Sequence, residues 1–221
     1  MLGQEYENWY SEMRKAEEDG KDFTVSEPTP NFRMRGEQWE RPANFEVIDR
    51  DATVLNQCVG IRIQGNSSRN EILKRFSVYS RPIYSGSNFF SERVFSDHDS
   101  HSVILRPGKY NAISSELITG RSCIAPPIRE AVVFLNGEYW YSAFIQEKFS
   151  TAFFSSKYGL LQDNIEIIDL SVWSRLGAKE QKQYQAILDF AESLDLSKND
   201  DYQTFQKSVD IQSYKIGRAH V

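Results

Sequence analysis

The sequence is poor in the residues that cross-link small domains or bind metals. Its 221 residues include only two cysteines, Cys58 and Cys123, and three histidines. Two cysteines so far apart form neither a disulfide framework nor a metal-spaced cluster, so we expect both to be ordinary buried residues. The sequence also lacks an apolar run long enough to span a membrane, and its first residues lack the apolar core of a signal peptide. These absences predict no membrane span and leave the compartment open.

Positive charge is not in excess either. Lys and Arg number 26 against 31 Asp and Glu, which gives a formal net charge of −5. A nucleic-acid partner requires clustered Lys and Arg that neutralise phosphates, so this balance argues against one. Apolar residues, in contrast, are plentiful. They make up 40% of the chain, enough to bury a core in one large domain or two small ones.

The most informative stretch joins two strand-like segments through a turn of small residues. Apolar and polar residues alternate in Val59–Gln64 and again in Arg75–Tyr79, which predicts two half-buried strands. The turn between them offers backbone N–H groups that no bulky side chain shields, and such a turn is suited to holding an anion. Lys74 lies at the start of the second strand, where its flexible side chain can bring the ammonium to a phosphate oxygen. The residues assigned to this site are Gly65, Asn66, Ser67, Ser68, Arg69 and Lys74.

The same patterns predict the other elements. Residues 132–148 form a hairpin, because Asn136-Gly137 is the strongest short signal for its turn. We expect helices at 5–18, 111–118, 151–158 and 179–194 and one starting near Asp200, and strands at 44–49, 103–106 and 165–170. This order, an antiparallel sheet with one embedded helix followed by further helices, indicates the α+β class and suits a two-lobed body.

Three segments together resemble the CotH family of secreted, spore-coat atypical protein kinases: GIRIQGNSSR at 60–69, KRFSVY at 74–79 and VVFLNGEYW…IQEK at 132–148. The resemblance covers roughly residues 31–214. It implies an atypical protein-kinase-like fold, with an antiparallel nucleotide-binding lobe followed by the start of a helical lobe. It also implies ATP and magnesium as cofactors, a Ser or Thr of a secreted or spore-coat protein as acceptor, and a secreted, cell-surface or spore-coat location.

The resemblance assigns roles to individual residues. Residues 65–69 are the phosphate-approach turn, and Lys74 pairs with the α- and β-phosphates. Glu116, in the embedded helix, forms the ion pair that positions Lys74, and Glu147 ends the strand along which adenine lies. Each of these residues also has an alternative interpretation without a binding role. The turn is then an ordinary hairpin loop, Lys74 a surface cation, and Glu116 an exposed helix-face glutamate. Where family members often carry glycine, this chain has Tyr141, which crowds the backbone near the nucleotide.

The chain divides accordingly into residues 1–44, an N-terminal polar extension, residues 45–150, the kinase-like nucleotide lobe, and residues 151–214, the beginning of the helical lobe. Residues 215–221 match the translation of a sequencing adapter, and we expect them to be non-biological. The family's metal-binding and catalytic carboxylates follow the segment that ends here at Tyr214. We therefore expect no phosphotransferase activity, no catalytic residue and no metal ligand in this polypeptide. The alternative function is a noncatalytic spore-coat or cell-surface assembly module.

Two other patterns have less support. The segment Asp97–His101 combines carboxylates with two imidazoles and could bind a divalent metal, but no distant third ligand is evident, so a polar loop is favoured. Ser67 or Ser68 as a hydrolase nucleophile requires a partner histidine, and the surrounding residues form no nucleophile elbow.

Overall fold

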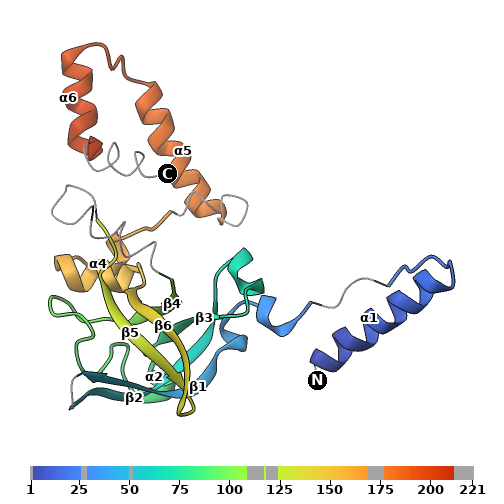
Figure 1. Ribbon diagram of the computed structural model, residues 1–221. Coiled ribbons are helices and arrows are strands. Elements are labelled where there is room, and N and C mark those ends of the chain that lie inside the picture. Colours follow the sequence, from blue (N-terminus) through green and yellow to red (C-terminus); the bar gives the residue numbers. More distant parts are fainter. Residues whose placement is uncertain are drawn as a thin grey trace.

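Alternating apolar residues build a six-stranded antiparallel sheet, so the chain belongs to the α+β class (Figure 1). The computed structural model describes residues 2–25, 29–49, 52–108, 117, 124–168 and 177–211. The strands are β1 (Arg41–Asp49), β2 (Ala52–Gln64), β3 (Arg75–Tyr79), β4 (Ser102–Pro107), β5 (Ile128–Leu135) and β6 (Glu138–Glu147). Their order across the sheet is β1-β2-β3-β4-β6-β5, so β3 and β4 lie at its centre.

The predicted hairpin is confirmed as β5 and β6. Leu135 pairs with Glu138 across a two-residue turn in which Asn136 and Gly137 have φ values of 53° and 85°. Positive φ at both positions matches the right-handed twist of the flanking strands, which is why Asn-Gly is favoured there. The strands predicted at 59–64 and 75–79 are also confirmed, although β2 starts earlier, at Ala52.

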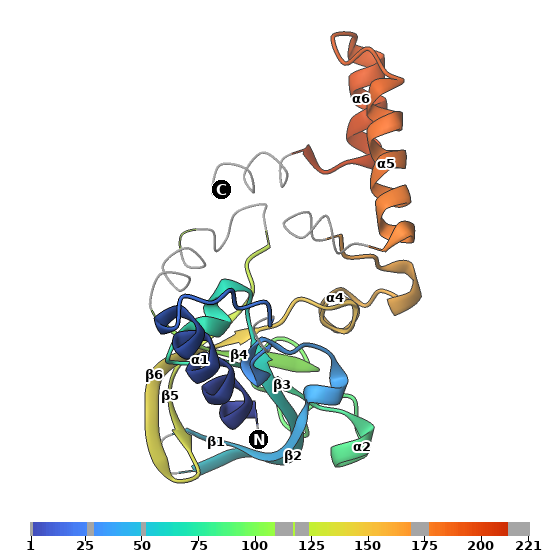
Figure 2. The same ribbon diagram turned by 90° about the vertical axis from the view of Figure 1, so that its right-hand side faces the viewer.

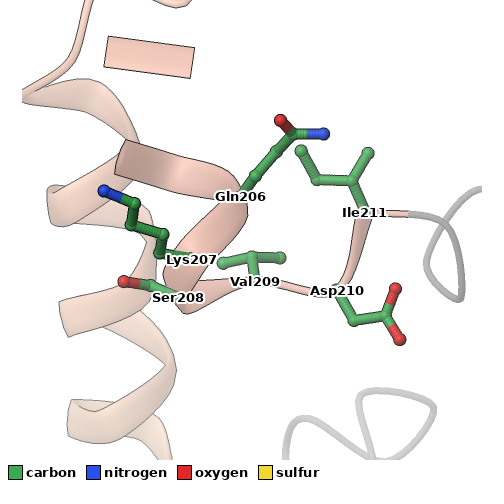
Figure 3. Close-up of a pocket in the computed structure, with 6 residues that line it drawn as sticks. All are labelled: Gln206, Lys207, Ser208, Val209, Asp210 and Ile211. Atoms are coloured by element: carbon green, nitrogen blue, oxygen red, sulfur yellow. The ribbon is translucent and has the colours of Figure 1, made fainter. Parts of the chain in front are cut away.

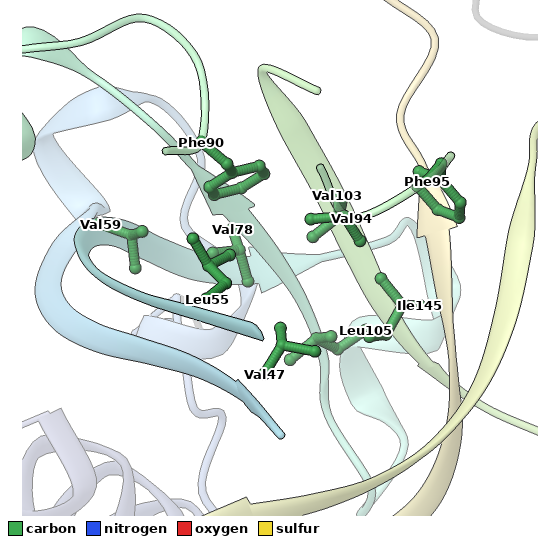
Figure 4. Packing of buried hydrophobic residues seen from close by; sticks show 10 residues of the cluster. All are labelled: Val47, Leu55, Val59, Val78, Phe90, Val94, Phe95, Val103, Leu105 and Ile145. Carbon is green, nitrogen blue, oxygen red and sulfur yellow. The ribbon is translucent and has the colours of Figure 1, made fainter. Parts of the chain in front are cut away.

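One face of the sheet carries the hydrophobic core (Figure 4). Side chains from β1 to β4 and from β6 meet there with residues of the loop that joins β3 to β4. The buried members are Val47, Leu55, Val59, Val78, Phe90, Val94, Phe95, Val103, Leu105 and Ile145. Because side chains alternate along a strand, the neighbours of these residues face the other side of the sheet.

The longer helices lie at the two ends of the chain (Figures 1 and 2). They are α1 (Leu2–Glu18), α4 (Thr151–Tyr158), α5 (Ala178–Glu192) and α6 (Asn199–Ser208), and the short α2 (Pro82–Ser85) follows β3. The helices expected at 5–18, 151–158 and 179–194 are therefore confirmed. In Figure 2, α5 and α6 run side by side, and Phe190 stacks on Phe205 with ring centroids 6.1 Å apart. In the described residues, no helix is long and apolar enough to cross a membrane.

Two sequence-based expectations are wrong. Residues 165–168 form no strand, because instead of pairing with a sheet edge they connect to α5: Glu166 accepts a hydrogen bond from Gln183 at 2.8 Å and pairs with Lys179 at 3.0 Å. Cys58 is exposed rather than buried, since it lies one residue away from the core-facing Val59 on β2. Cys123 and residues 169–170 lie outside the described residues, as does the helix expected at 111–118 except for Leu117.

The core predicts that truncation of Leu55 and truncation of Ile72 change the free energy of unfolding by very different amounts. Leu55 is 2% exposed and Ile72 is 90% exposed. We expect Leu55→Ala to lower the free energy of unfolding by about 2–5 kcal/mol, because it loses apolar burial and leaves a cavity. Ile72→Ala is the matched control, with a change within about 0.5 kcal/mol. Urea unfolding measures both, and equal losses would contradict this description of the core.

Candidate functional site

The predicted phosphate-binding turn is a tight bend between β2 and β3. Gly65 has a φ of +123°, and residues 67–70 form a 3-10 turn. A Cβ placed on Gly65 would lie 2.1 Å from the Oγ of Ser68, so the bend requires glycine on both conformational and steric grounds. We call residues 65–70 the bend below.

Arg69 turns inward and holds the bend closed. Its guanidinium donates to three backbone carbonyls: Gly65 O at 2.7 Å, Phe32 O at 3.1 Å and Met34 O at 2.8 Å. Two of these acceptors belong to the segment around the 3-10 turn Asn31–Arg33. Arg69 is therefore a buried clamp that joins two distant parts of the chain, rather than a side chain presented to solvent.

Two further arginines complete the connection between this N-terminal segment and the bend. Arg35 donates to the side-chain oxygen of Asn66 at 2.8 Å, and Arg33 donates to that of Asn70 at 3.0 Å. The segment thus lies against the bend and determines where its backbone points.

The structure brings Lys74 to the bend, as the sequence predicts. The Lys74 ammonium donates to the carbonyl of Arg69 at 2.7 Å and lies 4.2 Å from the centre of the Phe32 ring. The backbone of Lys74 is fixed as well, because the Tyr141 hydroxyl donates to its carbonyl at 3.1 Å. Burial raises the pKa of Tyr141, which keeps this hydroxyl protonated as a donor. Tyr141 therefore helps to position Lys74.

The bend retains capacity for an anion. Within the described residues, the backbone N–H groups of Ser67 and Ser68 have no protein acceptor, while those of Arg69 and Glu71 donate inside the bend. An ammonium carries three donors, and in the same part of the chain Lys74 uses one of them. These donors fit a phosphate oxygen, which accepts hydrogen bonds from both N–H groups and ammonium groups.

The face of the sheet opposite the core carries a group of polar and cationic side chains, together with the apolar Ile104 and Phe144. Strand register places Arg62 opposite Ser77 and Gln64 opposite Arg75 on β2 and β3, and Arg106 opposite Phe144 on β4 and β6. Residues directly opposite one another share a face. We call this the polar face; its members are Arg62, Gln64, Arg75, Ser77, Tyr79, Arg106, Gln146 and, just after β6, Lys148.

Tyr79 is the centre of the cations on the polar face. Arg62 donates to its hydroxyl oxygen from Nε at 3.2 Å and from a terminal nitrogen at 2.7 Å, and the Lys148 ammonium donates to the same oxygen. Both cations also lie 4.5 Å from the ring centre. Burial raises the pKa of the Tyr79 phenol, but Lys148 and Arg62 outweigh it and hold that pKa below its ordinary value.

On the polar face, Arg75 pairs with Glu71 at 3.5 Å, whereas the two cations at Tyr79 have no acidic partner in the described residues. In the described part of the chain, neither Arg62 nor Lys148 forms an ion pair, and the same is true of Lys74. Arg81 is the contrast, because it binds the buried Glu40 at 2.9 Å and also Glu37.

Neighbouring positive charges act on one another across this region. Burial lowers the pKa of Arg69, and the charges of Arg35 and Arg62 lower it further. Burial likewise lowers the pKa of Arg106, with an added effect from Arg75. The region from the bend to Lys148 is therefore electropositive in a chain of net negative charge.

Glu147, assigned to the nucleotide on the basis of the resemblance, points to the core side. Its carboxylate accepts from Ser100 at 2.6 Å and contacts His98 Nε2 at 3.0 Å. The backbone N–H groups of Glu147 and Lys148 donate to Pro127 O and Ser102 O. Burial raises the pKa of Glu147 despite its hydrogen bonds with Ser100 and His98. Its prediction as a cofactor contact stays a prediction.

His98 connects Glu147 to α4. Its ring is stacked on Phe95, with centroids 5.4 Å apart, and its Nδ1 lies 2.7 Å from Asp97. Asp97 in turn accepts from Lys157 of α4 at 2.8 Å. The segment 97–101 is thus a polar loop bound to the helix. Among the described residues, no group of three or more His, Cys, Asp or Glu could hold a metal ion.

Glu116 lies outside the described residues, so its ion pair with Lys74 stays a prediction. Figure 3 shows a pocket at the end of α6, which is lined by the consecutive residues Gln206–Ile211 and is separate from the bend.

Sequence reasoning missed Arg62 and Tyr79. The alternation that predicted the two strands also placed both residues at polar positions, which was the available signal. Their meeting depends on the register of β2 against β3, which the sequence alone does not reveal.

The chain matches no protein-family model, and no curated protein or solved structure is significantly similar to it.

The bend predicts that Gly65 does not tolerate a side chain. We expect Gly65→Ala to lower the free energy of unfolding by about 1–3 kcal/mol, since the backbone conformation is unfavourable for alanine. Gly159→Ala is the control: Gly159 also has positive φ, but a Cβ added there would meet no atom within 4 Å. Adding Ser68→Ala to Gly65→Ala should recover part of the loss. Denaturant unfolding measures all three, and no recovery would contradict the clash with Ser68.

The lowered pKa of Asp97 predicts how the stability of the fold depends on pH. Hydrogen bonds with Lys157 and His98 lower its pKa from 3.8 to about 2. A carboxyl group with a lowered folded-state pKa stabilises the fold above the unfolded value and loses that contribution as pH falls through the folded value. We expect Asp97→Asn to reduce the melting temperature at neutral pH and to flatten its decline between about pH 4 and pH 2. Identical melting profiles of variant and parent would contradict the interaction.

Proposed function

We propose that this chain contains the nucleotide-binding lobe and the beginning of the helical lobe of a CotH-like, ATP-dependent protein kinase that modifies Ser or Thr of secreted or spore-coat proteins. The observation that carries the proposal is the position of the Lys74 ammonium, 2.7 Å from the bend carbonyl of Arg69. A glycine-containing bend with unpaired N–H groups and an adjacent ammonium is the combination that a polyphosphate requires.

The antiparallel sheet supports the same proposal. Phosphoryl transfer requires little covalent chemistry from the protein and depends on holding and aligning the polyphosphate. An anion-binding bend at one end of two paired strands, held by Arg69 and Tyr141, provides a rigid support for that purpose. When bound, ATP with magnesium supplies the transferable phosphoryl group. The bend and Lys74 would bind and orient its phosphates.

The charge distribution also favours a nucleotide over a neutral ligand. Lys74 and Arg62 form no ion pair in the described residues, and their charges add to the positive potential that attracts polyphosphates. Both side chains are half-buried, and half-buried cations without carboxylates are unfavourable to a fold by themselves, so an anionic ligand gives this arrangement a physical reason.

The proposal predicts nucleotide-dependent stabilisation. Mg-ATP at about a hundred times its dissociation constant should stabilise the protein by about 2.7 kcal/mol, which raises the melting temperature by about 5–10 °C. We expect Lys74→Ala to abolish most of that increase. Lys198→Ala is the matched control, because this exposed lysine pairs with Asp195 far from the bend in sequence. Thermal unfolding with and without Mg-ATP tests the proposal. An unchanged melting temperature for the parent chain would reject it and favour a noncatalytic assembly module.

A further inference from the structure

The Tyr79 phenol oxygen lies where two cationic side chains converge. Arg62 donates two hydrogen bonds to this oxygen and Lys148 donates a third. A neutral phenol is a weaker acceptor than a charged oxygen, and hydrogen bonds between ionised partners are about twice as strong as neutral ones. The donors around this oxygen are therefore arranged as they would be around an oxyanion.

The surroundings of Tyr79 make the cations difficult to explain by packing alone. Arg81 lies 4.8 Å from the centre of the Tyr79 ring, but its charge is balanced by Glu40 and Glu37. Arg62 and Lys148 have no such balance in the described residues. Two like charges held on one oxygen repel each other, and this repulsion is relieved when an anion lies between them.

The polar face around Tyr79 also contains buried polar atoms without partners. Ser77, 1% exposed, makes no hydrogen bond of ordinary geometry through its hydroxyl, although it lies near enough to Tyr79 to help lower the pKa of that phenol. The Nε of Arg75 and the Oε1 of Gln64, on adjacent strands, are likewise buried and unpaired. Buried polar atoms without partners are rare and costly, and a bound ion or water is one of the explanations for them.

We propose that Arg62 and Lys148 form a phosphate subsite, in which the Tyr79 phenol oxygen occupies the position that a phosphate oxygen takes on binding. The ligand class is a phosphate or polyphosphate anion. The inference deepens the proposed function and rests on it for the identity of the ligand, since a nucleotide polyphosphate bound at the bend would extend along the polar face towards Lys148. The subsite itself depends on the contacts at Tyr79 alone.

The proposal predicts that two substitutions, Arg62→Ala and Tyr79→Phe, change the affinity for pyrophosphate in opposite directions. Inorganic pyrophosphate is the probe, and calorimetric titration of the full chain gives its affinity. Arg62→Ala should weaken binding by about tenfold or more, because a charge-assisted donor is lost. Tyr79→Phe should strengthen binding by about threefold or more, because the phenol oxygen no longer competes for both cations. A purely structural role of Tyr79 predicts weaker or equal binding. Arg93→Ala, at an exposed arginine paired with Asp99, is the matched control and should bind as the parent does.

A spectroscopic measurement does not depend on how Arg62→Ala folds. The near-ultraviolet absorbance of tyrosinate reports the ionisation of Tyr79, with Tyr79→Phe identifying its signal. Pyrophosphate that binds Arg62 and Lys148 in place of the phenol oxygen removes the cations that stabilise the ionised phenol, so we expect the titration of Tyr79 to move to higher pH. An unchanged titration under saturating pyrophosphate, or equal affinities for the parent, Arg62→Ala and Tyr79→Phe, would overturn the subsite.

The two proposals fail differently. If Mg-ATP stabilises the parent and Lys74→Ala abolishes the effect, while Arg62→Ala binds pyrophosphate as the parent does, the nucleotide site stands and the subsite falls. If pyrophosphate binding depends on Arg62 but Mg-ATP does not bind, the subsite stands and takes a phosphate from another source, while the nucleotide function falls.

Discussion

The alternation of β3 between two chemically different faces is the constraint on which the rest of this molecule depends. Val78 is fully buried in the core, and its neighbours Ser77 and Tyr79 face the opposite side. Both edges of β3 are paired, with β2 and with β4. A shift of one residue would place Tyr79 in the core and Val78 among the cations, so core packing also fixes the cationic centre. Stability and the candidate site are therefore set by the same register.

Arg81 and Arg69 bind different kinds of acceptor. Arg81 is neutralised by Glu40, and Gly60 makes room for that pair, because a Cβ there would lie 2.1 Å from the Glu40 carboxylate. Arg69 is satisfied instead by backbone carbonyls, which supply hydrogen bonds but no negative charge. The second arrangement leaves the local potential positive while keeping the bend rigid. A binding surface for anions requires both properties, since a mobile loop loses entropy on binding and a neutral one does not attract the ligand.

Sequence reasoning succeeded where the determinants were local. The Asn136-Gly137 turn, the helix at 151–158 and the two strands around the bend all follow from residues within a few positions of one another. The strand predicted at residues 165–168 is wrong. Its apolar and polar residues alternate as in a strand, but the segment contacts helix α5 instead of pairing with another strand. For the candidate site, sequence reasoning found the bend and Lys74 but could not foresee that Arg69 faces inward or that Glu147 lies in a buried cluster with His98, 49 positions away.

The sequence by itself determined the sheet-forming pattern, the turn chemistry and the adjacency of the bend to Lys74, because these depend on periodicity and on short-range sterics. Only the tertiary structure decided which cations meet. Arg62 and Lys148 are far apart in sequence, and they converge on Tyr79 because β2 pairs with β3 and β6 lies beyond β4. Strand order is a property of the whole fold, so the centre of positive charge appears only when the sheet is assembled.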